Sequence, residues 1–288
     1  MTRVNLDIEE DTVPLSPEEL EKCLADPLWR LCSGRIYKIL IKGDDDENED
    51  DGLVLPFKPN RAQRRLLKRL WYRNLILKAR QLGFTTLVCI MWLDHALFNP
   101  NSACGIIAQD RETAEALFRN KVKFAYDNLP PELKRMFPLQ SCNKSEIHFK
   151  HNNSFIRVAT SMRSGTIHRL HISEFGKICA KFPDKAIEVV TGSIPAVPKN
   201  GIVVIESTAE GRDGEFFKMS QKAEANHLMR KTLTMRDYRF HFFPWWREPN
   251  YRLPVDGIII TKEDRDYFAQ VEAACNTKLD RKSTRLNS

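Results

Sequence analysis

The stretch Leu75–Thr86, "LILKARQLGFTT", has the outline of a strand, a tight loop and the start of a helix. A phosphate-binding loop is usually written G-x-x-x-x-G-K-[ST], with a lysine just before the hydroxyl residue. Gly83 and Thr85 fit that spacing, but Phe84 stands in the place of the lysine. Two cations, Lys78 and Arg80, lie earlier in the same loop. The stretch therefore indicates either a variant phosphate loop or a basic turn without a ligand.

On both sides of this stretch, short β-rich apolar runs alternate with longer helical runs. This alternation predicts an α/β fold with a mainly parallel sheet sandwiched between helices. Ligands of such sheets bind at the carboxyl ends of the strands. The expected strands are 74–78, 103–109, 166–172 and 201–207, with a hairpin around 151–153, and the expected helices are 85–98, 111–128, 185–190 and 215–225.

Two further strand ends carry polar residues. "RLHISEF" (169–175) ends in Glu174, where a nucleotide hydrolase places a water-activating carboxylate, while Ser173 stands where an aspartate usually completes the Mg²⁺ shell. "IESTAEG" (205–211) offers Ser207 and Thr208 at a third strand end; taken alone it fits an ordinary glycine-containing turn better than a loop that senses a γ-phosphate. A metal triad of His168, His171 and Glu174 is disfavoured because residues three apart on a strand point to opposite faces, so both histidines are interpreted as packing residues.

Composition fits a soluble, intracellular protein with a polyanionic partner. The chain has 288 residues, 42% apolar and 29% charged, and a net charge of +7. Seven acids are concentrated in "DDDENEDD" (44–51), interpreted as a solvated linker, so the rest of the chain carries twice the net charge of the whole. Such an excess suits nucleic acid, although ordinary solvated lysines and arginines would give the same count. No apolar run reaches the length of a membrane span, and the acidic N-terminus lacks the apolar core of a signal peptide.

Taken in order, these segments resemble the ATPase domain of the phage terminase large subunit, the motor that packages viral DNA. The resemblance covers roughly residues 53–275. Its segments are "FKPNRAQ" with Gln63, similar to the adenine-recognising segment; "KARQLGFTT", similar to the deviant Walker A loop with its lysine at the start; "LHISEFGKI", similar to Walker B; "ESTAEG", similar to the coupling motif; and "FFPWWREPNYRL", similar to the segment that leads out of the ATPase core.

The resemblance implies a P-loop NTPase core of the additional-strand type that binds ATP and Mg²⁺. It implies that Lys78 meets the phosphates, that Arg80 stabilises charge on the transferred phosphoryl group and that Glu174 activates the water. Ser207 and Thr208 are then the coupling residues, and Thr85 holds Mg²⁺, with Ser173 and Glu174 acting through water. The implied nucleotide-binding residues are Gln63, Lys78, Ala79, Arg80, Gln81, Leu82, Gly83, Phe84, Thr85 and Thr86.

The implied function is ATP hydrolysis that translocates double-stranded DNA into a procapsid, in the cytoplasm of the host cell. The implied partners are DNA, the portal protein and the terminase small subunit, with a homo-oligomeric ring on the portal and no membrane. Expected parts are a helical lead-in with the acidic linker (1–52), the ATPase domain (53–260), and the start of a linker to a missing nuclease domain (261–288). The tail from about residue 281, "RKSTRLNS", is interpreted as foreign sequence or as a basic tail.

Alternative functions remain open at this point. Phe84 and Ser173 would suit an inactive nucleotide-binding scaffold, whereas the retained Glu174 favours a motor. A helicase-like nucleic-acid translocase shares the same core chemistry. The basic helix 61–73 suits either DNA phosphates or solvent, and the tandem Trp245-Trp246 suits core packing better than base stacking.

Overall fold

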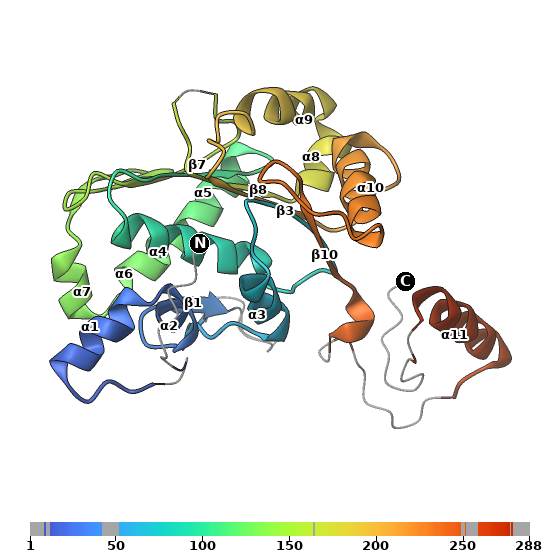
Figure 1. The fold of residues 1–288 in the computed structure, drawn as a ribbon, viewed down its shortest axis with the longest axis horizontal. Coiled ribbons are helices and arrows are strands. Elements are labelled where there is room, and N and C mark those ends of the chain that lie inside the picture. Colours follow the sequence, from blue (N-terminus) through green and yellow to red (C-terminus); the bar gives the residue numbers. More distant parts are fainter. Residues whose placement is uncertain are drawn as a thin grey trace.

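The computed structural model describes residues 9, 12–41, 52–163, 165–248, 251, 259–276 and 278. Its centre is an eight-stranded sheet in the order β10-β3-β9-β8-β4-β7-β6-β5, parallel from β10 to β7 and antiparallel beyond it. Figure 1 shows α4, α5 and α6 on one face and α8, α9 and α10 on the other. The predicted α/β class, with a mainly parallel sheet between helices, is confirmed.

The strands of this sheet are β3 (Arg73–Lys78), β4 (Ala103–Ile107), β5 (Leu139–Cys142), β6 (Glu146–Phe149), β7 (Phe155–Ala159), β8 (Arg169–Ser173), β9 (Ile202–Ser207) and β10 (Arg239–Phe243). A separate antiparallel pair consists of β1 (Lys38–Ile41) and β2 (Leu53–Pro56). The hairpin predicted around 151–153 is confirmed as β6 and β7.

The α-helices are α1 (Pro17–Ala25), α2 (Pro27–Cys32), α3 (Arg61–Lys68), α4 (Phe84–Phe98), α5 (Arg111–Leu117), α6 (Phe124–Asp127), α7 (Pro131–Met136), α8 (Phe175–Lys181), α9 (Pro183–Glu188), α10 (Gly214–Leu228) and α11 (Lys262–Cys275). π-helical turns follow α5 (Phe118–Lys123) and α9 (Val189–Ser193), and a 3₁₀ turn covers Trp245–Arg247. The helix expected over 111–128 is thus interrupted by the first π-helical segment. A helix directly after Glu174, α8, and a strand at 239–243 were not predicted.

The central strands bury both faces, so they read as continuous apolar runs rather than alternating ones. Ile76 and Val204 pack into the core beneath α4, whereas their neighbours Leu75 and Val203 pack into the core beneath α8 and α10. Helix α4 is apolar all round and almost entirely buried, as its sequence predicts.

The N-terminal segment packs on α4. Ser16 caps α1 and Pro17 occupies its first turn, as the sequence predicts. The Arg30 guanidinium donates to both carboxylate oxygens of Asp94 at 2.7 Å, and the Tyr37 hydroxyl donates to Asp94 Oδ1 at 2.7 Å. Residues of the lead-in thus share the core beneath α4, while the division of the chain at residue 53 stays a prediction.

The acidic run 44–51 and the tail from 281 lie outside the described residues. Within the described part of the chain, every helix is too short or too polar to cross a bilayer.

Candidate active site at the strand ends

The three polar strand ends lie side by side at one edge of the sheet. Strand β9 is inserted between β3 and β8, and all three run parallel. Leu77 is the register partner of Ser207, and Ser173 is the register partner of Glu206. The strand between the loop-bearing β3 and the acid-bearing β8 is the additional strand that the sequence resemblance implies.

The loop after β3 is held by α3. Gly83 has φ +71°, and a β-carbon there would lie 2.7 Å from the Gln63 amide nitrogen. Gln63 Nε2 donates to the Gly83 carbonyl at 2.7 Å, while Gln63 Oε1 accepts from the backbone N–H of Asn60 at 2.8 Å. The loop thus needs a glycine beside Gln63, and it feeds directly into the N-terminus of α4, whose free N–H groups can bind an anion. Gln63 therefore lies at the loop, and its contact with adenine stays a prediction.

Phe84 is a core residue. Its side chain is 1% exposed, and its ring lies 4.5 Å from the ring of Phe243 at the end of β10. A lysine at this position would have to bury its charge in that apolar contact. The cation of the site must therefore come from elsewhere in the loop.

Lys78, the last residue of β3, occupies the centre of the site. Its Nζ lies 2.8 Å from Glu174 Oε1 and 3.1 Å from Glu206 Oε2, and its side chain is 6% exposed. Burial on its own would lower the pKa of Lys78, but the charges of Glu206 and Glu174 outweigh burial and raise the pKa. Arg80 is exposed, and its carbonyl accepts from the Tyr251 hydroxyl at 2.5 Å.

Glu174 adopts an unusual backbone conformation between β8 and α8. Its φ of +50° lies in the left-handed region, which is costly for a residue with a side chain. Its carboxylate is partly exposed and accepts from Lys78 Nζ on one oxygen and from Thr208 Oγ1, at 3.5 Å, on the other. The strained turn therefore presents this carboxylate between the lysine of β3 and the residue that follows β9.

Glu206 is a site residue that sequence reasoning missed. It is fully buried in β9, and Oε1 accepts from Thr85 Oγ1 at 2.6 Å and from Ser173 Oγ at 3.0 Å. Burial would raise the pKa of Glu206, but His171, Lys78 and the Thr85 hydroxyl lower it to about 2. The available signal was a lone acid inside the otherwise apolar run "GIVVIES". His171 is buried as expected, but its Nε2 lies 3.5 Å from Glu206, so it borders the site.

Ser207 and Thr208 are buried beside this cluster. Ser207 is fully buried, and its hydroxyl forms no hydrogen bond within the described part of the chain. A β-carbon on Gly176 would lie 2.8 Å from Ser207 Oγ, so α8 approaches the end of β9 closely only because residue 176 is glycine. Ser207 and Thr208 thus contact the segment that carries Glu174.

The donor set fits Mg²⁺ in the company of phosphates. The oxygens at the strand ends are hydroxyls of Thr85 and Ser173 and carboxylates of Glu206 and Glu174, which are hard ligands. Among the described residues, no group of three or more His, Cys, Asp or Glu is arranged to hold a metal alone. Mg²⁺ is usually held by one or two carboxylates together with substrate phosphates and waters, so the set present here is sufficient.

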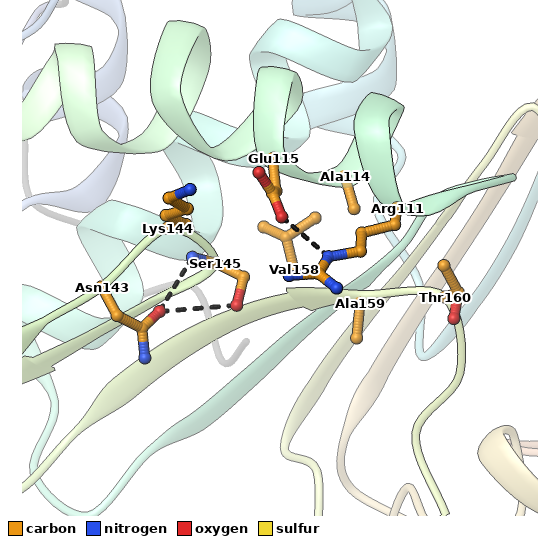
Figure 2. Close-up of a pocket in the computed structure, with 9 residues that line it drawn as sticks. All are labelled: Arg111, Ala114, Glu115, Asn143, Lys144, Ser145, Val158, Ala159 and Thr160. Atoms are coloured by element: carbon orange, nitrogen blue, oxygen red, sulfur yellow. Dashed lines mark hydrogen bonds and ion pairs between the residues drawn. The ribbon is translucent and has the colours of Figure 1, made fainter.

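A separate hollow lies between α5 and the β5–β7 region. Figure 2 shows Arg111 and Glu115 on the helix above it and Asn143 and Ser145 in the turn below. Arg111 Nε donates to Glu115 Oε1 at 2.9 Å across its upper rim. None of the described residues that line it belongs to the predicted site. The described lining residues are Arg111, Ala114, Glu115, Asn143, Lys144, Ser145, Val158, Ala159 and Thr160.

Comparison with known proteins gives matches among solved structures only. No family model and no curated protein matches the chain. The large terminase of bacteriophage HK97 superposes with a TM-score of 0.51 at 16% identity, over 77% of this chain and 48% of that one. The ATPase domain of the Thermus phage P74-26 large terminase matches with a TM-score of 0.47 at 15% identity, over 75% of this chain and 88% of that one. This chain spans about half the length of the HK97 protein, and it shares the fold of the matched part, which confirms at the level of fold the resemblance drawn from the motifs.

Proposed function

We propose that this chain is the ATPase motor domain of a viral terminase large subunit, which hydrolyses ATP to move double-stranded DNA into a procapsid. One observation carries the proposal. The Lys78 ammonium bridges the carboxylates of Glu174 and Glu206, and the Thr85 hydroxyl donates to Glu206, at the carboxyl ends of the parallel strands β3, β9 and β8, where the loop after β3 enters a helix N-terminus.

Binding of the triphosphate falls to the loop 79–83 and to the cations around it. Backbone N–H groups at the start of α4 suit phosphate oxygens. Lys78 is already charged and desolvated among carboxylates, so a phosphate would compete with Glu174 and Glu206 for its ammonium. Arg80, exposed at the mouth of the loop, is placed to stabilise negative charge on the transferred phosphoryl group.

Hydrolysis requires a water aligned with the γ-phosphorus, and Glu174 is the residue for it. Its carboxylate accepts a proton from the attacking water, the new oxygen–phosphorus bond forms, and the bond to the β–γ bridging oxygen breaks to leave ADP and phosphate. Mg²⁺ at Thr85 supplies neutralisation of the phosphate charge. Thr208 donates to the Glu174 carboxylate. A shift of this carboxylate when the γ-phosphate leaves would therefore change a hydrogen bond of Thr208, one of the two proposed coupling residues.

The motor role adds DNA, the portal protein and the terminase small subunit as partners, and a homo-oligomeric ring as the working assembly in the host cytoplasm. A basic surface at α3 supports the DNA part of the proposal, because five cations line one hollow there. They are Arg61, Arg64, Arg65, Lys68 and Arg69. Trp245 and Trp246 are half-buried, and Trp246 contacts Phe242, which is itself exposed, so the pair lies outside the core that the sequence favours for it.

The test is Mg²⁺-dependent ATP hydrolysis by the purified protein, with and without double-stranded DNA. Glu174→Gln should lower kcat by about 10²-fold or more, since it removes the general base. Lys78→Ala should abolish turnover by weakening phosphate binding. Exposed Glu132→Gln and Lys144→Ala serve as matched controls and should keep wild-type rates.

Each other outcome has a definite reading. Loss with Glu174→Gln but not with Lys78→Ala would move phosphate binding to Arg80. Tight ATP binding without any turnover, both alone and with DNA and portal protein, would contradict the motor and favour the inactive scaffold.

A further inference from the structure

Ser173 ends β8 at the place where nucleotide hydrolases usually carry the aspartate of the Mg²⁺ site. Its hydroxyl donates to Glu206 Oε1 at 3.0 Å. Ser173 and Glu206 are register partners on neighbouring parallel strands, so their side chains emerge on the same face and at the same level of the sheet. The carboxylate absent from β8 is thus present one strand over, on β9.

The contacts of Glu206 are those expected of the missing aspartate. Thr85 is the hydroxyl residue of the loop, and its Oγ1 donates to Glu206 Oε1 at 2.6 Å. In phosphate-loop enzymes, this hydroxyl and the aspartate of the Walker B strand hold the metal together. Strand β9 also lies directly beside β3, the strand that leads into the loop of Thr85.

A purely structural ion pair with Lys78 is the competing explanation. Such a pair would need only Oε2, which lies 3.1 Å from Lys78 Nζ. Instead, two hydroxyls converge on Oε1. His171 is fully buried behind them, with Nε2 3.5 Å from Oε1, yet neither of its ring nitrogens forms a hydrogen bond within the described part of the chain. The ring nitrogens of His171 therefore remain without hydrogen bonds beside Glu206, which a purely structural ion pair does not explain.

We propose that Glu206 on β9 supplies the carboxylate that holds Mg²⁺ beside Thr85, in place of the acid that Ser173 replaces on β8. This inference rests on the proposed ATP-binding function and assigns its metal-holding residue. Compared with the common phosphate-loop pattern, β8 then carries Ser173 in place of the acid, and β9 carries the acid Glu206 at the same level of the sheet.

The test measures how the affinity for a fluorescent ATP analogue, methylanthraniloyl-ATP, depends on Mg²⁺ concentration. Wild-type protein should bind more tightly as Mg²⁺ rises. Glu206→Gln should raise the half-saturating Mg²⁺ concentration about tenfold or more, with a much smaller change of affinity in EDTA. Ser173→Ala, which removes one hydroxyl and keeps the carboxylate, should raise the half-saturating Mg²⁺ concentration less than Glu206→Gln does. Adding Ser173→Asp to Glu206→Gln should restore the Mg²⁺ response, because it returns a carboxylate to the same level of the sheet.

The matched control is Asp94→Asn, which neutralises another buried carboxylate, on α4 and paired with Arg30. It should lower stability without changing the Mg²⁺ response, and all variants are compared at a temperature where circular dichroism shows them folded. If Glu206→Gln does not fold, the double variant is compared with Glu206→Gln plus Ser173→Asn, which differs from it only by the carboxylate.

An unchanged Mg²⁺ requirement in the Glu206 variants would overturn the proposal. So would an equal loss of affinity with and without Mg²⁺, which would assign Glu206 to Lys78 alone. Failure of the wild-type protein to bind the nucleotide under any condition would instead overturn the proposed function, and this inference with it.

Discussion

Phe84 distinguishes the loop after β3 from the common phosphate-loop pattern, and its surroundings give the physical reason. The side chain fills a buried contact with Phe243, so the residue before the loop threonine belongs to the core rather than to the site. The charge that the pattern places at residue 84 is supplied here by Lys78, the last residue of the preceding strand. In the proposed function, Lys78 rather than residue 84 therefore meets the phosphates.

The first prediction concerns this position. Phe84→Lys restores the common sequence motif. It should nevertheless destabilise the protein by about 3–5 kcal/mol, because it removes a buried aromatic contact and buries a charge. It should not raise ATP hydrolysis. Urea unfolding and steady-state ATPase assays measure both effects. Phe84→Leu is the control, with a smaller loss of stability and retained turnover, and a Phe84→Lys protein that is stable and faster than wild type would refute this explanation.

A second prediction at the residue scale concerns pH. Burial depresses the pKa of His241 to about 3, while its ring donates from Nε2 to Asn74 Oδ1, which accepts at 3.1 Å. Because the folded pKa lies below the unfolded one, the neutral ring contributes stability that is complete above about pH 6.5 and is lost as the pH falls toward 3. At pH 5 this loss amounts to about 2 kcal/mol.

His241→Gln keeps a donor for Asn74 and removes the titration. Between pH 7 and pH 5 the variant should therefore lose about 2 kcal/mol less unfolding free energy than the wild-type protein. Urea unfolding at the two pH values measures the difference. An equal decrease of the unfolding free energy in the two proteins between pH 7 and pH 5 would show that His241 is not buried in its neutral form.

At the scale of elements, the turn from β8 to α8 combines strain with function. Glu174 holds φ +50° at the point where the strand ends and the helix begins. Such strain persists only when the surrounding structure enforces it, and here it delivers the carboxylate to Lys78.

This strain predicts that a glycine at position 174 gives a more stable protein than an alanine, the reverse of the usual order within a helix. Glu174→Gly and Glu174→Ala both remove the carboxylate, so both should abolish hydrolysis. Glycine should nevertheless give the more stable protein, by about 1 kcal/mol, because only glycine adopts this φ without cost. Thermal unfolding of the two variants provides the measurement. An alanine variant as stable as the glycine variant would mean that the turn is not strained.

The sequence predicts elements better than it predicts the contacts between them. The loop at 79–83, the strand before it and the carboxylate at 174 follow from local apolar patterns, and the structure brings Lys78, Thr85 and Glu174 together as the parallel sheet requires. Glu206 could not be assigned from its own strand, because its role depends on the register of β9 against β8. Strand β10 was missed for a similar reason, since its partner β3 lies more than 150 residues earlier.

At the scale of the whole molecule, the N-terminal segment and the α4 core are joined by a buried ion pair. Arg30 and Asp94 are 4% exposed each, and the Tyr37 hydroxyl donates to the same Asp94 carboxylate. Breaking a buried pair leaves an uncompensated charge, which costs more than the pair contributed.

Arg30→Met should therefore destabilise the protein by about 3–5 kcal/mol, whereas Arg30→Met combined with Asp94→Leu should recover much of the loss. Urea unfolding of the single and double variants measures the coupling. If the double variant were as unstable as the single one, the charge left on Asp94 would not be the cause. Nucleotide affinity should be unaffected in both, because the pair lies outside the strand-end site.

The most direct test of the proposed ATP site is a structure of the Glu174→Gln variant with ATP and Mg²⁺. We expect the triphosphate to lie along residues 79–85, with Lys78 Nζ on a phosphate oxygen at about 3 Å and the metal beside Thr85. A triphosphate bound elsewhere, or at the loop while Lys78 stays paired with Glu206, would contradict the proposed site.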